Sequence, residues 1–351
     1  MATNLPKDMQ AVHLVKYKSD YEVRIAPVPT LGPNDLLLRV RAAGYCHTDY
    51  QVWEGVYESP TPLIPSHEPV GEIVAIGPQA ERLGIWRLGQ RVGVLLFRHA
   101  CGHCVNCRST NDVRFCKNGD RAGLVNDGGM AEYIIGDADN CVLLPDEVSW
   151  EQAAPLMCAG STTWASLMAA DVKSPEPIGI IGIGGLGTLA VQFAKALGHP
   201  VVAMDNRQEG RDLATAFDLK ADLVVNPGND NAVKEIKAWS GKDGLAAVIT
   251  CTDHVDITKW SLNLLRPHGV AVPLGLPPAG FAFDAFTMIF SELVVKGSLV
   301  STRLQAEAMM EVVARHNIRS HLTVLKMEDA PRLPKLYMDP HLKGRLVMKM
   351  G

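Results

Sequence analysis

The sequence has no long apolar run, no block of like charge, and no internal repeat or low-complexity tract. None of its apolar stretches approaches the ~18 residues that cross a membrane as a helix. Its 34 lysine and arginine residues stand against 38 aspartate and glutamate residues, so the formal net charge is −4 and no basic cluster is present. Nucleic acids and anionic membranes attract basic patches. These absences exclude a membrane-spanning helix and argue against a nucleic acid or a membrane as partner.

The N-terminus lacks the basic and apolar segments of a secretory signal, since residues 1–6 read MATNLP. We therefore expect a cytoplasmic protein. With 351 residues, 47% of them hydrophobic and 21% charged, the chain has the composition of a globular protein and the length of two domains. Eight cysteines in a reducing compartment predict metal ligands or buried thiols in preference to disulfides.

Potential metal ligands gather between residues 46 and 68. Two short motifs contain them, Cys46-His47-Thr48-Asp49 and Ser66-His67-Glu68. A thiolate and a neutral imidazole are ligands that zinc prefers, and a catalytic zinc takes three protein ligands and keeps one position open. Cys46 and His67 would supply two of the three. The alternative, a buried thiol and a hydrogen-bonded histidine, stays open on this stretch alone.

A second group of thiols follows the spacing C-x2-C-x2-C-x8-C. Its members are Cys101, Cys104, Cys107 and Cys116. Four thiolates can bind a structural zinc ion or an iron–sulfur cluster, but the wide last gap differs from the bacterial ferredoxin pattern. Two adjacent disulfides would need an oxidising compartment. We favour structural zinc, which would also help this polar lobe to fold.

Two patterns of secondary structure divide the chain near residue 150. Before it, strand signals at residues 36–40, 69–76 and 90–96 predict a β-rich domain. After it, apolar strands alternate with helical stretches, which predicts a doubly wound parallel sheet and an α/β fold class. The strands of this sheet are expected at residues 177–183, 201–204, 222–225, 246–250, 269–274 and 293–299.

A glycine-rich turn joins the first of these strands to a helix. It reads Gly182-Ile183-Gly184-Gly185-Leu186-Gly187. Between a strand and a helix this motif lets the pyrophosphate of a dinucleotide meet the helix N-terminus. Asp205, about 20 residues further along, is placed to bind the adenosine ribose. Its charge favours NAD over NADP, and Arg207 would weaken that preference. A plain glycine-rich turn near an acid is the alternative.

Together these segments resemble the zinc-dependent medium-chain alcohol dehydrogenases over nearly the whole chain. The resemblance rests on the motifs above and on residues 67–72 (HEPVGE), 157–160 (MCAG) and 297–303 (GSLVSTR). It implies a GroES-like catalytic domain formed by residues 1–152 and 301–351, with a structural zinc lobe at about 97–120. It further implies a Rossmann domain that binds NAD, formed by residues 153–300.

The resemblance also implies roles for single residues. Cys46, His67 and Cys158 would bind a catalytic zinc, and the four-cysteine lobe would bind a second zinc. Asp49 would orient His67 without itself binding the metal, and Glu68 would lie beside the metal. Thr48 would hydrogen-bond the substrate hydroxyl and carry its proton away. The residues expected at the cofactor are His47, Thr162, Gly182, Gly184, Gly185, Leu186, Gly187, Asp205, Arg207, Leu274, Leu276 and Arg303.

The implied reaction is hydride transfer between an alcohol and NAD, with zinc as the Lewis acid. Trp53, Tyr57 and Leu96 would line the substrate pocket, and Leu96 stands where ethanol-specialised relatives have a bulky aromatic residue. The wider pocket predicts small to medium primary alcohols and aldehydes as substrates, although all three residues could be core packing instead. A polyol or secondary-alcohol dehydrogenase of the same fold, and a zinc-lobe binding or regulatory protein without turnover, are the alternatives. The resemblance implies a homo-oligomer, with a tetramer favoured over a dimer.

Three features depart from the family pattern. Gln51 replaces a histidine that in many relatives passes the alcohol proton to solvent. An amide does not titrate, so the proton relay would run through ordered water or lose that step. Ser66 stands where the family usually has glycine, at a cost of about 1 kcal/mol if the backbone there needs a positive φ and at no cost otherwise. The last gap of the cysteine lobe is also longer than expected, which a surface loop can absorb.

Overall fold

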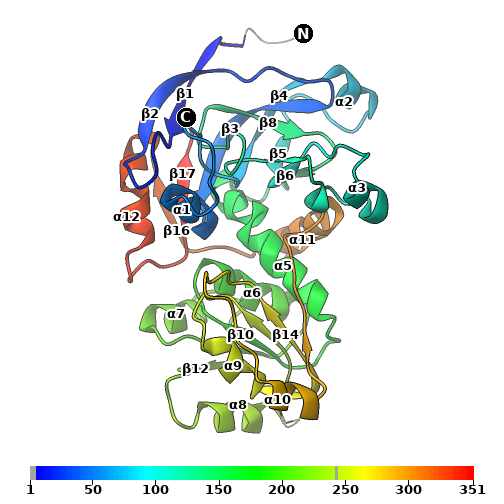
Figure 1. Cartoon of the computed structure of the whole chain (residues 1–351), viewed down its shortest axis with the longest axis vertical. Helices are drawn as coiled ribbons and strands as arrows, with labels where there is room; N and C mark the ends of the chain where they lie inside the picture. The colour runs from blue at the N-terminus through cyan, green and yellow to red at the C-terminus, as the bar shows by residue number, and fades with distance from the viewer. Residues whose placement is uncertain (1–4, 242–243) are drawn as a thin grey trace. The chain divides into compact units, whose positions relative to one another are not determined.

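The computed structural model describes residues 5–241 and 244–351, and the chain forms two compact units. Unit 1 contains the residues up to Cys158 together with Thr302–Ala314 and Leu322–Gly351 (Figure 1). Unit 2 contains Ala159–Ser301 and Arg315–His321. The domain division that the sequence predicts lies at residues 152/153 and 300/301, and the functions assigned to the two domains stay a prediction.

A seven-stranded, mostly antiparallel sheet forms the centre of unit 1. Its longest strand, β3 (Asp35–Tyr45), pairs with β4 (Pro69–Ile76), β8 (Tyr133–Asp137) and β17 (Arg345–Lys349). Most side chains of β3 are buried, as expected for a strand with apolar neighbours on both faces. β4 has the bounds that the sequence predicts, and the other strands of the sheet are β5 (Arg91–Val94), β9 (Cys141–Leu143) and β16 (Leu322–Leu325).

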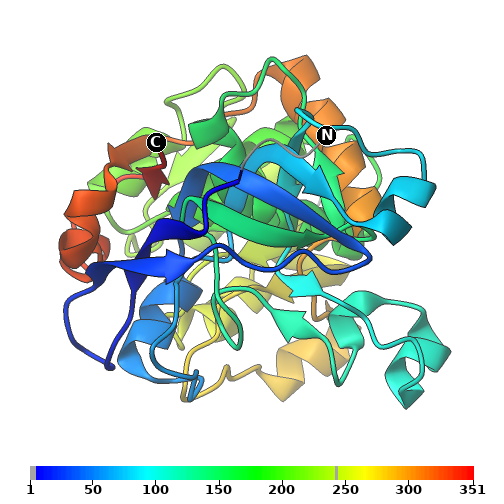
Figure 2. The ribbon, with the colours of Figure 1, turned by 90° about the horizontal axis from the view of Figure 1, so that it is seen from above.

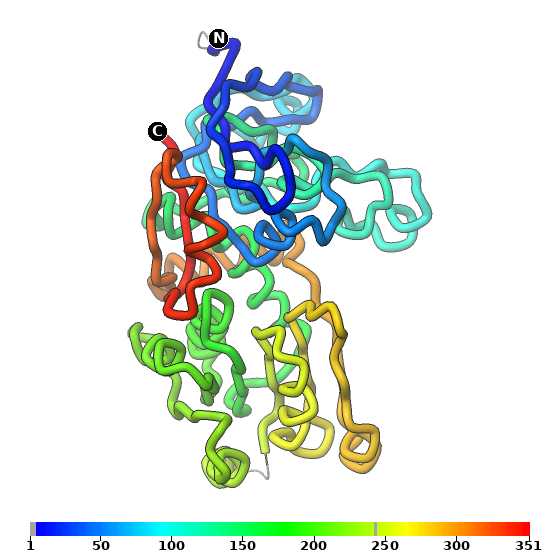
Figure 3. Tube along the Cα trace, turned by 60° about the vertical axis from the view of Figure 1, so that its left-hand side comes forward, coloured from blue at the N-terminus to red at the C-terminus, as the bar shows by residue number. Residues whose placement is uncertain are grey.

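Two further strand pairs belong to unit 1. β1 (Asp8–His13) and β2 (Glu22–Pro27) run antiparallel beside each other (Figure 2). β6 (Phe97–Arg98) pairs with β7 (Asp120–Arg121), and the segment between them projects to one side in Figure 3. The helices of unit 1 are α1 (His47–Glu54), α2 (Pro78–Arg82), α3 (Val105–Thr110), α4 (Trp150–Ala153), α12 (Leu333–Tyr337) and most of α11 (Arg303–His316). Short 3-10 turns lie at Val113–Phe115, Ala154–Met157 and Met327–Arg332.

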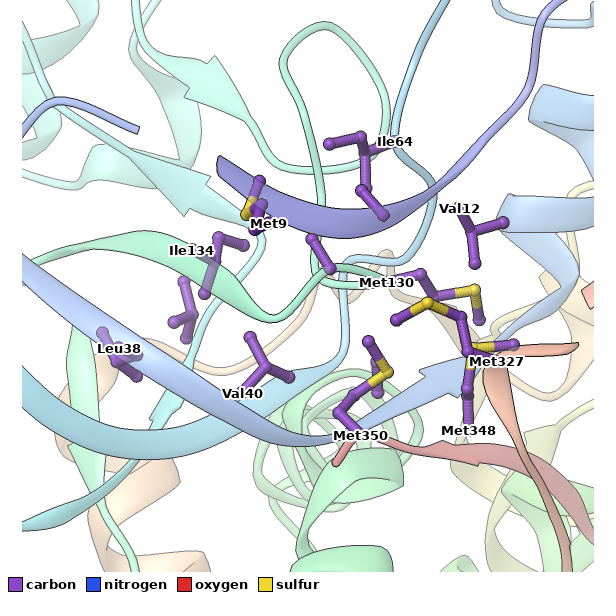
Figure 4. Packing of buried hydrophobic residues seen from close by; sticks show 14 of the residues in the cluster. Met9, Val12, Leu38, Val40, Ile64, Met130, Ile134, Met327, Met348 and Met350 are labelled. Carbon is purple, nitrogen blue, oxygen red and sulfur yellow. The ribbon is translucent and has the colours of Figure 1, made fainter. Parts of the chain in front are cut away.

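Methionines fill part of the core of unit 1. Figure 4 shows how they gather between segments that are far apart in the sequence. The buried methionines of this cluster are Met9, Met130, Met327, Met348 and Met350. Methionine is unbranched and flexible, so it fills irregular gaps between strands that meet at different angles. The C-terminal segment thereby packs against the first strands of the chain.

Unit 2 is built on a six-stranded parallel sheet with the order β12-β11-β10-β13-β14-β15. The strands are β10 (Ile178–Ile181), β11 (Val201–Met204), β12 (Leu223–Val225), β13 (Leu245–Thr250), β14 (Leu265–Pro273) and β15 (Val294–Val295). The helices are α5 (Ala159–Ala170), α6 (Gly185–Ala196), α7 (Gln208–Leu213), α8 (Ala232–Ser240), α9 (Ile257–Leu262) and α10 (Ala285–Phe290). The predicted doubly wound sheet is confirmed, although β15 is much shorter than the strand expected at residues 293–299, a stretch that contains Lys296, Gly297 and Ser298.

Among the residues that the structure describes, no helix has both the length and the apolar character needed to cross a membrane.

Candidate functional site

A buried cluster of potential metal ligands lies in unit 1, where the end of β3, the start of β4 and the 3-10 turn Ala154–Met157 come together. One ligand atom from each of Cys46, His67, Glu68 and Cys158 lies within 4.8 Å of the others. Cys46 is the N-cap of α1, and its Sγ atom is 3.9 Å from the Sγ atom of Cys158. Residues 112 positions apart are thus brought together as the sequence motifs suggest.

The two thiols of this cluster are electrostatically linked. The hydrogen bond from the Cys158 thiol holds the pKa of Cys46 well below its usual range. The same pairing, together with burial, raises the pKa of Cys158 well above its usual range. Two thiolates this close repel each other, and a divalent cation between them would remove that repulsion. The donor set therefore fits a soft divalent metal such as zinc.

His67 is oriented for metal binding by Asp49. The Nδ1 atom of His67 lies 3.2 Å from Oδ1 of Asp49, and both side chains are fully buried. Its other ring nitrogen, Nε2, is buried and has no hydrogen-bond partner among the described residues. A buried ring nitrogen without a partner destabilises the folded protein unless another group binds to it. A metal ion at the cluster would do so, which is the second observation that fits a zinc site.

Asp49 holds the site together from α1. Its Oδ2 atom accepts a hydrogen bond from the backbone N–H of Cys46 at 2.9 Å. Its Oδ1 atom accepts a second from the backbone N–H of Ser66 at 3.0 Å. One carboxylate therefore fixes the backbone at Cys46 and before His67, besides the imidazole ring itself.

Glu68 pairs with Arg345, a residue that sequence reasoning missed. An Nη atom of Arg345 donates to both carboxylate oxygens at 2.5 and 2.6 Å, and the two side chains expose only 4% and 0% of their surface. Burial raises the pKa of Glu68 to about 7, although the Arg345 guanidinium acts in the opposite direction. Arg345 lies in β17, 277 residues from Glu68, and no local signal in the sequence predicts the contact.

The four cysteines of the projecting segment form a second cluster. One sulfur atom from each of Cys101, Cys104, Cys107 and Cys116 lies within 4.8 Å of the others. The sulfurs accept backbone N–H groups, for example from Cys104 to Cys101 and from Cys107 to Cys104, both at 3.4 Å. Such donors, led by that of His103, lower the pKa of Cys101 to about 6. The wide last gap contains the end of α3 and the turn Val113–Phe115, so the spacing and the geometry both fit a closed tetrahedral zinc.

Other residues that the sequence assigns to the site lie in α1 or shortly after it. Thr48 and Gln51 are three residues apart and so share one face of α1. Gln51 is buried, and its Oε1 atom accepts a hydrogen bond from the hydroxyl of Tyr57 at 2.8 Å. His47 lies 5.9 Å from the ring of Tyr337. A polar link between Gln51 and Tyr57 is therefore present where the relay histidine of the family would stand.

The structure gives two of the predicted pocket residues a packing environment. Trp53 donates its Nε1–H to the carbonyl of Ser19 at 2.7 Å, and its ring stacks on Tyr50 at 5.4 Å. Leu96 is half-buried, and its carbonyl accepts the backbone N–H of Ala122. These contacts agree with the packing alternative for Trp53 and Leu96, and the substrate-pocket role stays a prediction.

A cavity of about 400 Å³ opens at the carboxyl ends of the parallel strands of unit 2. The glycine-rich turn forms one wall, where Gly182 takes a φ of 84° and α6 begins at Gly185. A Cβ atom at Gly187 would approach the carbonyl oxygen of Gly182 to 2.1 Å, so only glycine allows the turn and the helix to pack. The position and the volume suit part of a dinucleotide.

Asp205 lies in this cavity but also supports the glycine-rich turn. Its Oδ2 atom accepts the backbone N–H of Ile183 at 2.7 Å, and its Oδ1 atom accepts that of Arg207 at 2.8 Å. The guanidinium of Arg207 lies 3.5 Å from the same carboxylate and also lines the cavity. The acid predicted to bind a ribose is therefore already anchored, with a positive charge beside it.

The other predicted cofactor residues are distributed over both units. Gly182, Gly184, Asp205 and Arg207 line the cavity, whereas Gly185, Leu186 and Gly187 form the following helix turn. Thr162 lies in α5, and Leu274 and Leu276 follow β14. His47 and Arg303 belong to unit 1, where Arg303 lies over the ring of Trp86. Sequence reasoning missed the cavity residues Asn206, Pro227, Gly228, Cys251, Thr252, His254 and Ile257, most of which directly follow the carboxyl end of a strand.

Comparison with known proteins gives matches over nearly the whole chain. Residues 32–146 match the family model described as alcohol dehydrogenase GroES-like domain, and residues 185–315 match that described as zinc-binding dehydrogenase. An alcohol dehydrogenase of Geobacillus stearothermophilus is 35% identical over 344 residues, which is 97% of this chain and 100% of that protein. One of Rhizobium meliloti is 32% identical over 98% of this chain and 99% of its own. The structure of an acetophenone reductase from Geotrichum candidum in complex with NAD has a TM-score of 0.86 and 26% identity, covering 99% of both chains.

Proposed function

We propose that this chain, which belongs to the zinc-dependent medium-chain alcohol dehydrogenase family, interconverts small to medium primary alcohols and aldehydes by hydride transfer to or from NAD(H). The observation that carries the proposal is the buried cluster of Cys46, His67, Glu68 and Cys158 with its unsatisfied imidazole nitrogen. Three ligands and a free position are what a catalytic zinc requires. The four-cysteine lobe would hold a second, structural zinc.

Each group around the first cluster would then have a distinct task. Cys46, His67 and Cys158 would hold the metal, which when bound supplies a Lewis acid for the substrate oxygen. Asp49 keeps the imidazole of His67 in place, and Thr48 would take the proton of the substrate hydroxyl. Gln51 does not titrate, so a proton leaving past Thr48 would pass to water rather than through residue 51.

NAD is the proposed cofactor because a carboxylate lies at the cavity of unit 2. The charge of Asp205 would repel a 2′-phosphate, and the Geotrichum candidum reductase is described in complex with NAD. Arg207 acts against this preference, since it brings a positive charge to the same wall. We therefore propose that the protein prefers NAD to NADP, but only by a moderate factor.

Replacing Asp205 with serine should reduce the preference for NAD. The substitution removes the charge, and one hydrogen bond to a charged group corresponds to about tenfold or more in the ratio of kcat/KM for NAD to that for NADP. Steady-state kinetics with both cofactors measures the ratio. Asp222→Ser is the matched control, because Asp222 also accepts a backbone N–H, that of Val201, but does not line the cavity. An unchanged ratio in Asp205→Ser would show that Asp205 does not select the cofactor.

A screen of NADH consumption over size-matched aldehydes and ketones tests the proposed reaction. Turnover of aldehydes supports it, whereas faster turnover of ketones would favour the secondary-alcohol alternative, with which the name of the acetophenone reductase agrees. Metal analysis of the same sample separates both from a binding protein without turnover. Two zinc ions per chain are expected for the enzyme, and one ion with no NADH consumption would refute the proposal.

A homo-oligomer is proposed from the exposed apolar face of α10. Phe286, Ile289 and Phe290 expose 68%, 71% and 75% of their surface, and α10 is followed by β15, the edge strand of the parallel sheet. A second copy of this chain is the fitting occupant, because an edge strand can pair with its own copy across a twofold axis. The face then becomes an interface instead of an aggregation hazard.

Charging this face should separate the subunits. We expect the double variant Ile289→Asp, Phe290→Asp to have a smaller mass in solution than the wild type, because two buried charges would destabilise the interface. Size-exclusion chromatography with light scattering measures the mass. Leu304→Asp is the control, since Leu304 is 76% exposed but lies in α11. If the double variant and the wild type had the same mass, α10 would not be the interface.

A further inference from the structure

Ser66 is a buried residue in a backbone conformation that favours glycine. Its side chain is inaccessible to solvent, and its φ is 78°. A side chain at such a φ is strained, because Cβ approaches the following carbonyl oxygen. The residue directly precedes His67 and Glu68, so the strain lies at the backbone that presents two members of the first cluster. Something in the structure must offset it.

Four hydrogen bonds fix Ser66. Its Oγ atom donates to the carbonyl of Gly44 at 2.8 Å and accepts the backbone N–H of Glu68 at 3.2 Å. Its N–H donates to Asp49 at 3.0 Å, and its carbonyl accepts the N–H of Gly129 at 2.7 Å. A glycine could make the last two bonds, because they use only the backbone. The two bonds of the hydroxyl are available only with serine or threonine, and threonine is β-branched and unsuited to this φ.

Glycines pack closely around the same peptide. A Cβ atom at Gly128 would lie 2.2 Å from the carbonyl oxygen of Ser66, and one at Gly123 would lie 2.7 Å from its carbonyl carbon. On the other side, a Cβ atom at Gly44 would lie 1.9 Å from Oε2 of Glu68. The peptide before His67 is therefore enclosed, and the Ser66 hydroxyl links the carbonyl of Gly44 to the backbone of Glu68.

We propose that Ser66 is a positioning residue for the metal site. Its hydroxyl links the carbonyl of Gly44 to the N–H of Glu68, which holds the backbone of residues 66–68 so that the Nε2 atom of His67 faces the thiols of Cys46 and Cys158 before a metal binds. The backbone strain at Ser66 is offset by these two bonds. The inference rests on the proposed function, since it assumes that the first cluster binds zinc.

The rate at which the intact holoenzyme loses zinc to a chromogenic chelator tests this role. Ser66→Ala removes the hydroxyl and keeps the strain, and Ser66→Gly removes both. We expect both variants to release one of their two zinc ions about tenfold or more faster than the wild type, as for other groups that orient metal ligands. The second ion should leave at the wild-type rate, and Ser66→Gly should unfold at a higher temperature than Ser66→Ala.

Ser261→Ala is the matched control, because the buried Ser261 hydroxyl also donates to a backbone carbonyl, that of Thr258, at 2.8 Å. It should leave both release rates unchanged. If Ser66→Ala lowers the unfolding temperature while both zinc ions leave at wild-type rates, Ser66 has only a structural role and the inference is overturned. If the wild type itself carries one zinc, the proposed catalytic site is absent and the inference falls with it.

Discussion

Replacing Cys158 with serine is expected to reduce the zinc content from two ions to one per chain and to lower kcat/KM by more than about a hundredfold. Loss of a residue that merely orients a ligand costs ~10–100-fold in metal affinity or activity, and a direct thiolate ligand contributes more. The hydroxyl of serine is a harder and less acidic donor than a thiol, so it does not replace the ligand. Atomic absorption gives the zinc content and initial rates give kcat/KM.

Cys141→Ala is the control for this experiment. Cys141 is a buried free thiol in β9 that belongs to neither cluster, and burial raises its pKa well above the usual range. The variant should keep two zinc ions even if its stability falls. A Cys158→Ser enzyme that also kept two ions and most of its activity would contradict the assignment of Cys158.

Replacing Arg345 with methionine is expected to destabilise the folded protein by about 3–5 kcal/mol. The substitution leaves the carboxylate of Glu68 buried without its charged partner, and a buried pair that loses one member costs far more than an exposed one. The measurement is urea unfolding at about pH 8, above the pKa of about 7 of Glu68, so that Glu68 carries its charge in the wild type. The substitution leaves little empty space, because methionine fills much of the volume of the arginine side chain.

Two further variants isolate the effect of the charge. Arg41→Met breaks the pair of Arg41 with Glu72, whose side chains are 26% and 33% exposed, and should cost at most about 1 kcal/mol. Adding Glu68→Gln to Arg345→Met removes the unpaired charge and should recover part of the lost stability. If Arg345→Met and Arg41→Met lowered the free energy of unfolding equally, the buried pair of Glu68 and Arg345 would be no more stabilising than an exposed pair.

Strand bounds were predictable where an apolar run in the sequence coincides with a buried position in the sheet. The strand at residues 69–76 and that at 201–204 have the predicted bounds, because each is an apolar run that ends at a clear polar or glycine signal. Residues 293–299 are apolar only up to Val295, because Lys296, Gly297 and Ser298 follow, and only Val294–Val295 pair with the one neighbour of this edge strand. This strand therefore ends at a polar and glycine signal as well, earlier than the predicted bound.

The members of the two candidate metal clusters and the supporting Asp49 could be found from the sequence, but the other supporting contacts could not. Cysteine spacing and the glycine-rich turn are local, so they could be found by reading along the chain. The buried partner of Glu68 could not, because Arg345 lies 277 residues away and has no unusual neighbours in the sequence. The double role of Asp205, which holds the glycine-rich turn as well as facing the cavity, also depends on a contact across 22 residues.

The stretch from Cys46 to Glu68 has some properties that depend on residue type alone and others that depend on tertiary contacts. The sequence by itself determined which side chains could bind a metal there, because ligand chemistry depends on residue type. Only the tertiary structure decided that Arg345 neutralises Glu68 and that Ser66 is held at a φ of 78°. These properties arise from contacts between distant segments, and the free energy of such contacts depends on burial and geometry that no local pattern contains.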